Sequence, residues 1–181
     1  KSFGVTTLEQ RHIKQSGNNI AIDFIGKKGV QNKCTIKNKQ LTKNLKRAKK
    51  NLHKHERIFA YVSGNQIYHL KSSDVNEYLK QFGNFSTKNF RTWNANLELI
   101  SELVKQIPDT ISSREKYVSD SIKKVSKQLH HTATVCRKNY IDPQLVQTFI
   151  QEPKRFLSFF KNSKTKEDIT DNFLDFLETE Y

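Results

Sequence analysis

A run of apolar residues between Phe90 and Ile107 constrains the fold of this chain more than any other feature. Apolar side chains recur there at spacings of three and four residues: Phe90, Trp93, Leu97, Ile100, Val104 and Ile107. This period matches one face of an α-helix, and Pro108 marks its end. The pattern predicts a long helix, opening near Thr87, that buries this face against other elements.

Other segments also favour helices. Residues 41–52 carry the apolar positions Leu41, Leu45, Ala48 and Leu52 between lysines, and residues 72–83 have an N-cap signal at Asp74 and a stop at Gly83. Residues 113–129 and the acidic stretch 167–181 are also helical in pattern, and Asp142 followed by Pro143 predicts a helix start. Helices therefore dominate the predicted fold.

Two segments predict β-hairpins instead. In "NNIAIDFIGKKGVQNKCTI", apolar residues alternate before and after "GKKG", so Lys27 and Lys28 lie at a tight tip between Gly26 and Gly29. Lysine is also common at exposed hairpin turns for solubility alone. "RIFAYVSGNQIYHL" predicts a second strand pair around a Gly-Asn turn. The fold class that we expect is mainly α with a small β-hairpin or sheet portion, an α+β fold.

Length and composition favour one globular domain. The chain has 181 residues, of which 35% are hydrophobic and 28% are charged. It contains no run of about 18 apolar residues and no apolar signal segment near its start, so we expect an intracellular protein without a membrane partner. Cys34 and Cys136 are too few and too far apart in sequence to indicate a zinc site or a disulfide framework.

The charge is large and unevenly distributed. The net charge is +14; residues 1–54 hold 14 Lys or Arg against Glu9 and Asp23, whereas residues 167–181 hold six acids and no Lys or Arg. A basic surface of this density attracts polyanions. Nucleic acid fits better than an acidic membrane, because no basic stretch has a strongly apolar opposite face. A face that only confers solubility is the alternative.

The segment "LHHTATVCRKNYIDP", residues 129–143, crowds His130, His131, Arg137 and Lys138 near Tyr140. A phenol has a pKa near ~10, so it is a poor nucleophile unless cations stabilise its charged form and its product. Arg91, in the first turns of the predicted helix at 87–107, would also be favoured by a shared anion such as phosphate. Surface imidazoles, a phenol at the edge of the core and an arginine extending to water are the alternatives.

Five ordered blocks carry a resemblance over nearly the whole chain: "FGVTTLEQRHI", "DFIGKKG", "SSDVNEYLKQFG", "TKNFRTWNAN" and "HTATVCRKNYIDP". In this order they resemble the catalytic domain of the small type IB DNA topoisomerases of poxviruses, giant viruses and bacteria. The resemblance implies the catalytic-domain fold that these enzymes share with tyrosine recombinases. It also implies duplex DNA as the partner, action as a monomer, and no cofactor, neither metal ion nor nucleotide triphosphate.

Matched block by block, the resemblance implies four catalytic residues. Tyr140 would be the nucleophile that forms a 3′-phosphotyrosine, Arg91 and His131 would hold the phosphate oxygens, and Lys27 would protonate the leaving 5′ oxygen. Three further basic residues are expected to bind DNA: Lys28, Arg137 and Lys138. For Arg137 and Lys138 the alternative is that water merely solvates their side chains.

The family's first catalytic arginine belongs to a segment that precedes "FGVTTL", before Lys1. We therefore expect residues 1–181 to be a single, N-terminally truncated catalytic domain with impaired cleavage. Two alternatives are a tyrosine recombinase or integrase and a non-catalytic DNA-binding fragment. The first is disfavoured because recombinases usually have a His three residues before this arginine, whereas this chain has "KNFRTW" around Arg91.

Overall fold

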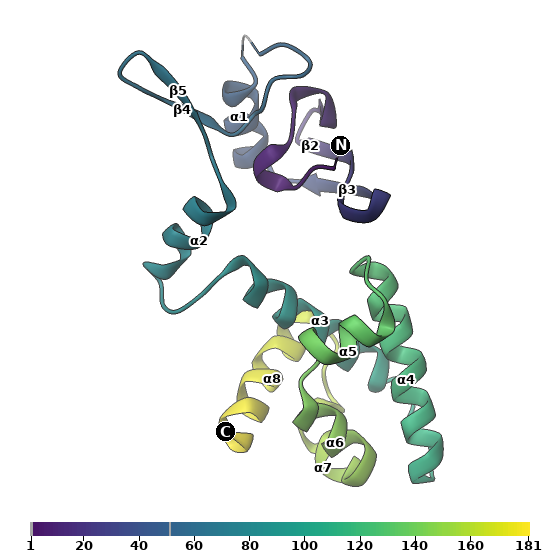
Figure 1. Ribbon diagram of the computed structural model, residues 1–181. Coiled ribbons are helices and arrows are strands. Elements are labelled where there is room, and N and C mark those ends of the chain that lie inside the picture. Colours follow the sequence, from purple (N-terminus) through teal and green to yellow (C-terminus); the bar gives the residue numbers. More distant parts are fainter. Residues whose placement is uncertain (1, 51) are drawn as a thin grey trace. The chain divides into compact units, whose positions relative to one another are not determined.

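The computed structural model describes residues 2–50 and 52–181, except for the side chain of Lys28. The chain divides into two compact units, unit 1 (Lys1–Ser86) and unit 2 (Thr87–Tyr181), which are described separately (Figure 1). Within the described residues, no helix combines the length and the apolar character that crossing a membrane requires. That the two units form one catalytic domain stays a prediction.

Unit 1 is built on a three-stranded antiparallel sheet in the order β1-β2-β3. The predicted hairpin around "GKKG" is confirmed, because β2 pairs with β3 from Ile25↔Gln31 to Asn19↔Lys37. The first strand was not predicted, since its four residues alternate too briefly to give a clear pattern. The strands are β1 (Ile13–Ser16), β2 (Asn19–Ile25) and β3 (Gln31–Lys37), and short 3₁₀ turns are η1 (Val5–Thr7), η2 (Gln10–His12) and η3 (Lys27–Gly29).

The helix α1 (Lys39–Ala48) follows β3 and packs on the sheet. The side chain of Asn38 caps its first turn by accepting from the Leu41 amide. Leu45 is buried with Ile13 and Ile20, but Leu41 is exposed, and the helix ends before Leu52. The predicted apolar stripe is therefore only partly buried, because the small sheet covers a narrow strip of the helix.

The rest of unit 1 consists of a second hairpin, β4 (Ala60–Ser63) with β5 (Gln66–His69), and helix α2 (Ser72–Lys80). The hairpin confirms the prediction around Gly64, which adopts a φ of 60°. The predicted N-cap at Asp74 is wrong: Lys71 is the N-cap, and the Asp74 carboxylate accepts from the Lys71 amide at 2.8 Å. An acid at the third helical position satisfies the amide of the N-cap residue, whereas an N-cap side chain would accept from an amide two or three residues further on.

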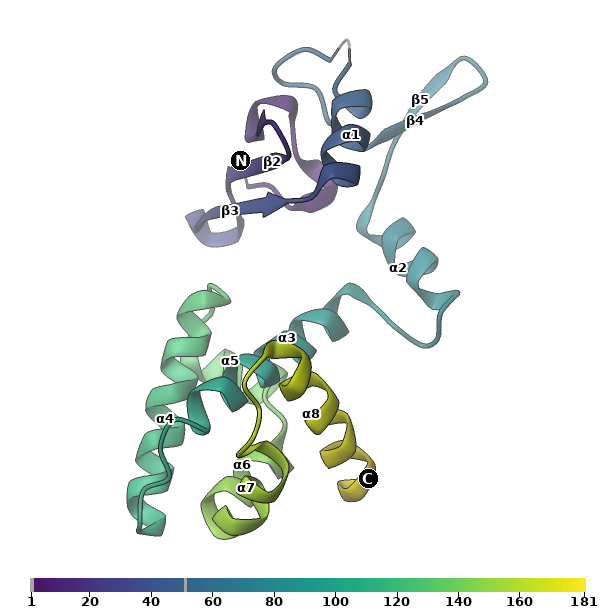
Figure 2. The same cartoon turned by 180° about the vertical axis from the view of Figure 1, so that it is seen from behind.

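Unit 2 is a bundle of helices around one apolar core. In both views α3 runs through its middle, with α4 on one side and α8 on the other (Figures 1 and 2). Large side chains fill the core, among them Leu99, Phe149, Phe160 and Phe176. The helices are α3 (Thr87–Leu103), α4 (Ile111–Gln128), α5 (Ala133–Tyr140), α6 (Pro143–Gln151), α7 (Pro153–Phe160) and α8 (Lys166–Glu180).

The helical predictions for unit 2 are largely confirmed. The long helix begins at Thr87 as expected and buries Leu97 and Ile100, and Asp142 caps α6 by accepting from the Leu145 amide at 2.9 Å. Phe90 is an exception, since it lies 59% exposed at the start of α3. The short helices α5 and α7 were not predicted. The observed mixture of helices and small antiparallel sheets confirms the α+β fold class.

Candidate active site

The two histidines that precede α5 lie where α4 ends, and the first has a backbone role. His130 adopts a left-handed φ of 55°, and its amide donates to the carbonyl of Lys127 at 3.2 Å. The amide of His131 donates to the carbonyl of Ser126 at 2.8 Å. This pair of bonds is the Schellman arrangement, in which the left-handed position usually holds glycine. His130 therefore turns the chain so that His131 leads into α5.

Arg91 of α3 and His131 meet although 40 residues separate them. The Arg91 Nη1 atom lies 2.5 Å from the His131 Nε2 atom and 3.5 Å from the Leu129 carbonyl oxygen. A guanidinium group can only donate, so His131 Nε2 is the acceptor in this contact. The arginine thus presents an exposed, permanently charged fork beside the imidazole.

Tyr140 is the last residue of α5 and lies beside His131. The two ring centroids are 5.1 Å apart and the ring planes are inclined by 30°. The phenol is half-buried and packs against the core of unit 2. The structure therefore brings Arg91, His131 and Tyr140 together within one unit. A guanidinium and an imidazole beside a phenol can stabilise an anionic phosphoryl group that the phenol attacks.

Asn96 of α3 holds the backbone on both sides of Ile141. Its Nδ2 donates to the carbonyl of Tyr140 at 3.0 Å, and its Oδ1 accepts from the amide of Asp142 at 2.8 Å. The residue is 2% exposed, and Nδ2 also reaches the Thr92 carbonyl at 2.9 Å. Buried polar groups need hydrogen-bond partners within the protein because water cannot reach them, and the side-chain amide of Asn96 has such partners for both its nitrogen and its oxygen. Asn96 therefore joins the end of α5 to the start of α6.

Sequence reasoning did not single out Asn96, although a signal was present. The residue lies three positions after Trp93 and four before Ile100, which places it on the buried face of α3. A polar side chain on a buried helical face needs partners, and an amide offers both a donor and an acceptor. The partners lie 44 and 46 residues further along the chain, so only the tertiary structure reveals them.

Lys27 belongs to unit 1, where it begins the turn η3 between β2 and β3. The turn is closed by Gly26, whose amide donates to the Val30 carbonyl at 2.7 Å, and Gly29 adopts a φ of 75°. The positive φ explains why position 29 holds glycine, because residues with a side chain rarely adopt this conformation. Gly26 has no positive φ, but a Cβ there would lie 2.5 Å from the side-chain nitrogen of Asn32. The side chain of Lys27 is exposed on this tight turn, and the side chain of Lys28 lies outside the described residues.

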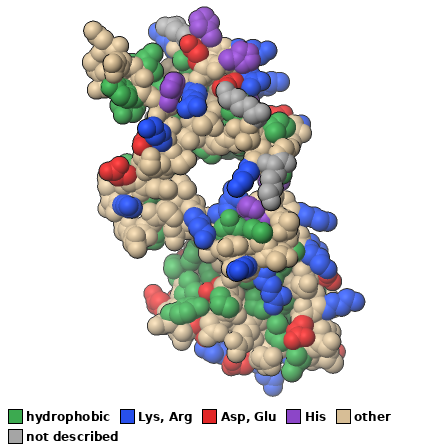
Figure 3. Space-filling model, in the orientation of Figure 1, with side chains coloured by type: hydrophobic (Ala, Val, Ile, Leu, Met, Phe, Trp, Pro, Cys, Tyr) green, Lys and Arg blue, Asp and Glu red, His purple; other side chains and the backbone are tan. Residues whose placement is uncertain are grey.

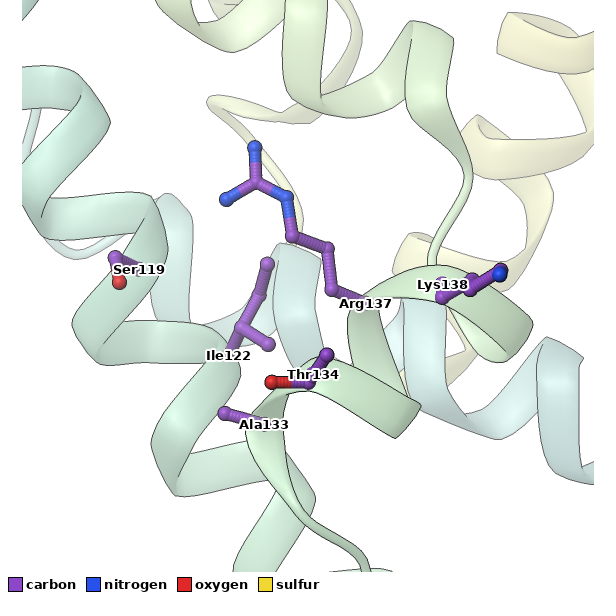
Figure 4. A pocket seen from close by; sticks show the side chains of 6 residues that line it. All are labelled: Ser119, Ile122, Ala133, Thr134, Arg137 and Lys138. Atoms are coloured by element: carbon purple, nitrogen blue, oxygen red, sulfur yellow. The ribbon is translucent and has the colours of Figure 1, made fainter.

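Arg137 and Lys138 follow different directions from α5. A cavity of about 310 Å³ lies between α4 and α5, and both Arg137 and Lys138 line it, although their side chains leave α5 in different directions (Figure 4). The hydroxyl-bearing residues Ser119 and Thr134 also line the cavity. On the visible face of unit 2, Lys and Arg side chains gather along α4 (Figure 3), which carries Lys116, Lys123, Lys124 and Lys127. Arg137 and Lys138 are thus both placed to contact an anion at this cavity.

Comparison with known proteins defines the class. Residues 1–167 match the sequence model of the family described as eukaryotic DNA topoisomerase I, catalytic core. Because this match covers most of the chain, the chain belongs to that family.

Viral relatives support the same class. The chain is 30% identical to a DNA topoisomerase 1B of Acanthamoeba polyphaga mimivirus over 168 residues, which cover 87% of this chain and 49% of that protein. It is 27% identical to DNA topoisomerase 1B of Vaccinia virus (strain Copenhagen) over 161 residues, and 25% identical to DNA topoisomerase I of Monkeypox virus over 160 residues. Each match covers 87% of this chain and 48% of the viral protein. The chain therefore spans about half the length of these relatives.

Proposed function

We propose that this chain carries the chemistry of a type IB DNA topoisomerase. In this proposal it cuts one strand of duplex DNA, lets the cut strand rotate, and religates it. The observation that supports the proposal most directly is the cluster of Arg91, His131 and Tyr140 in a chain that belongs to the topoisomerase I family. We further propose that it acts as a monomer inside the cell, without ATP or a metal ion.

In the proposed cleavage, the Tyr140 oxygen attacks the phosphorus atom in line with the 5′ oxygen. The bond from phosphorus to the phenol oxygen forms, the phenol gives up its proton to a solvent water molecule, and the bond from phosphorus to the 5′ oxygen breaks. Lys27 donates a proton to that leaving oxygen. The 5′ hydroxyl later attacks the 3′-phosphotyrosine and reverses the step, so the bond energy is conserved and no nucleotide triphosphate is consumed.

The contact between Arg91 and His131 implies a rearrangement when a phosphate binds. In the DNA-free site His131 Nε2 accepts from Arg91. Both residues must instead donate to the nonbridging oxygens, because charge spreads over these oxygens in phosphoryl transfer. We therefore propose that the phosphate replaces the contact between the two side chains and that the Nε2 atom of His131 gains a proton. The imidazole then becomes a donor in the same place.

Contacts to DNA away from the cleaved phosphate are also part of the proposal. Arg137 would bind a backbone phosphate over the cavity between α4 and α5, with Lys28 and Lys138 as further contacts. A net charge of +14 supports phosphate binding with little discrimination between base sequences. Duplex affinity should therefore fall steeply as salt rises. Affinity that does not change with salt would contradict this part.

Plasmid relaxation and covalent adduct formation test the function. Tyr140→Phe should abolish both and leave noncovalent DNA affinity nearly unchanged, because one hydroxyl contributes little beside many phosphate contacts. The matched control is Tyr78→Phe, which removes the hydroxyl of an exposed tyrosine in α2. The assays use residues 1–181 and a chain extended upstream by the arginine-containing segment that the family resemblance implies.

The two chains have different expected results. The extended chain should relax positive and negative supercoils without ATP or Mg²⁺, whereas residues 1–181 should show weak turnover or none. Relaxation by the Tyr140→Phe variant would refute the nucleophile. DNA binding without any adduct from the extended chain would instead favour a non-catalytic DNA-binding protein.

A further inference from the structure

A second basic surface lies in unit 1, and it is formed by residues other than those assigned to the chemistry. A surface cavity of about 540 Å³ opens between β1 and the outer side of α1. Five of its six lining residues are cationic; the lining consists of Gln15, Lys43, Lys46, Arg47, Lys49 and Lys50. We call this set the α1 basic cavity. None of these residues belongs to the proposed catalytic set.

Two hydrogen bonds hold the floor of the α1 basic cavity in place. The Lys49 ammonium donates to the Ile13 carbonyl of β1 at 2.7 Å, and the Gln15 amide donates to the Thr42 carbonyl of α1 at 3.1 Å. Burial lowers the pKa of Lys49 below its ordinary value. A bound anion would offset that cost, since it favours the charged ammonium. The helix and strand therefore form a rigid support for the outer cations.

The outer cations have no acidic neighbours to neutralise them. Lys43, Lys46, Arg47 and Lys50 are exposed, and in the described part of the chain none of them pairs with Asp or Glu. Residues 37–54 contain no acid at all. Cations gathered around one concavity repel one another, so they favour a multivalent anion.

The spacing of these cations matches a phosphodiester backbone. Lys43 and Arg47 lie four residues apart on one side of α1, and Lys50 follows three residues later, just past the end of the helix, so that the three span about 10 Å at the helical rise. A DNA strand carries one phosphate per about 3.4 Å of helix axis, so this length spans about three phosphates. A membrane surface fits less well, because Leu45 on the opposite side of α1 is buried against the sheet.

The α1 basic cavity lies at a definite distance from Lys27 within unit 1. The turn η3 follows Ile25 of β2, while the cavity borders β1, which pairs with β2 from Ile13↔Ile22 to Ser16↔Asn19. At about 3.4 Å per residue, these pairs lie roughly 10 to 20 Å along β2 from the turn. The same span is about three to six base-pair steps of duplex DNA.

We propose that the α1 basic cavity binds the backbone of the flanking duplex, about three to six base pairs from the phosphate at which Lys27 acts. The position along the DNA rests on the proposed function, because it takes the cleaved phosphate as its origin. The binding itself goes beyond that function, since it assigns a phosphate-binding role to residues outside the chemistry. The footprint on DNA is correspondingly longer than the catalytic residues alone would give.

The experiment measures affinity against duplex length in the Tyr140→Phe background, so that cleavage plays no part. With an unchanged α1 basic cavity, the affinity of the Tyr140→Phe protein should rise with duplex length up to a plateau, after correction for the number of overlapping binding positions on longer duplexes. The double variant Lys43→Gln/Arg47→Gln should reach its plateau with duplexes about three to six base pairs shorter. The matched control Lys71→Gln/Lys80→Gln removes the same charge from the N-cap and the last residue of α2. Thermal unfolding checks that both variants keep the fold.

The salt dependence on long duplexes gives a second readout. Loss of two phosphate contacts lowers the slope of log K against log salt by about 1.8, which is about 60-fold in affinity at 0.1 M salt relative to 1 M. The inference is overturned if the α1 variant matches the control, or if it loses affinity equally at every length. Binding of a second duplex per protein at this surface would also overturn it. None of these outcomes depends on adduct formation, which tests the proposed function separately.

Discussion

Replacing Asn96 by alanine should disturb the position of Tyr140 more than any other change outside the catalytic set. The substitution leaves the Tyr140 carbonyl and the Asp142 amide without the partners that they have at 3.0 and 2.8 Å. Each buried polar group that loses its partner costs about 1–3 kcal/mol, so for two groups we expect a loss of about 2–6 kcal/mol. For a unit of this size, that lowers Tm by at least about 8 °C.

A stability loss alone would not show that Asn96 positions Tyr140, the proposed nucleophile. The matched control is Arg114→Met, because Arg114 is also buried and donates to the carbonyls of Pro108, Asp109 and Ile150. Both variants should melt earlier. Below both melting temperatures, only Asn96→Ala should slow single-turnover adduct formation by the extended chain. Equal adduct rates in the two variants would refute the positioning role.

Asn96→Asp sharpens the test through pH. A carboxylate keeps an acceptor for the Asp142 amide, but it repels the carbonyls of Tyr140 and Thr92 unless it is protonated. Burial and these carbonyls therefore raise the pKa of the introduced carboxyl above its unfolded value of about 3.9. Stability is then greatest at low pH and is lost as pH rises through the folded-state pKa. A variant whose stability relative to wild type does not change with pH would contradict the predicted contacts.

Three further predictions follow from single residues. Lys27→Ala should slow cleavage, and a substrate with a better 5′ leaving group should restore the rate. The control Lys33→Ala, on β3, should cleave at the wild-type rate. If the better leaving group does not restore the rate of Lys27→Ala, Lys27 is not the general acid. His130→Gly should stabilise unit 2 by about 1 kcal/mol in urea unfolding, because glycine accepts the left-handed φ of 55° without strain; an unchanged or lower stability would count against this. Burial lowers the pKa of His12 below its ordinary value of 6.5, so unit 1 should lose stability as pH falls from about 6.5 toward the folded-state pKa. The variant His12→Gln should flatten this dependence of stability on pH, and an unchanged dependence in the variant would refute the prediction.

The local elements of this fold could be predicted from sequence, because the signals for them are local. The apolar period of α3, the cap at Asp142 before Pro143 and the glycines around Lys27 each specify an element within a few neighbouring residues. The family resemblance likewise rests on ordered blocks that can be recognised without coordinates. The assignment of Lys27, Arg91, His131 and Tyr140 to the chemistry comes from that resemblance and stays a proposal.

Other features were beyond local reasoning. A short helix such as α5 has too few residues for its apolar side chains to show a clear period. The exposure of Phe90 depends on how far the elements packed beside the start of α3 extend. Asp74 stabilises the start of α2 from inside the helix, which a cap motif alone does not distinguish from an N-cap. Similarly, the different directions of Arg137 and Lys138 depend on how α5 packs beside α4 (Figure 4).

The amino-acid sequence alone determined the family, the α+β class and the residue types on which the proposed chemistry rests. Only the tertiary structure decided which side chains meet: Arg91 contacts His131 across 40 residues, and Asn96 reaches the backbone at Tyr140 across 44. The physical reason is that hydrogen bonds and charge interactions act over a few ångströms of space, whereas sequence patterns record only spacing along the chain. Packing of the helices around the core of unit 2 brings residues that are distant in sequence within a few ångströms of one another.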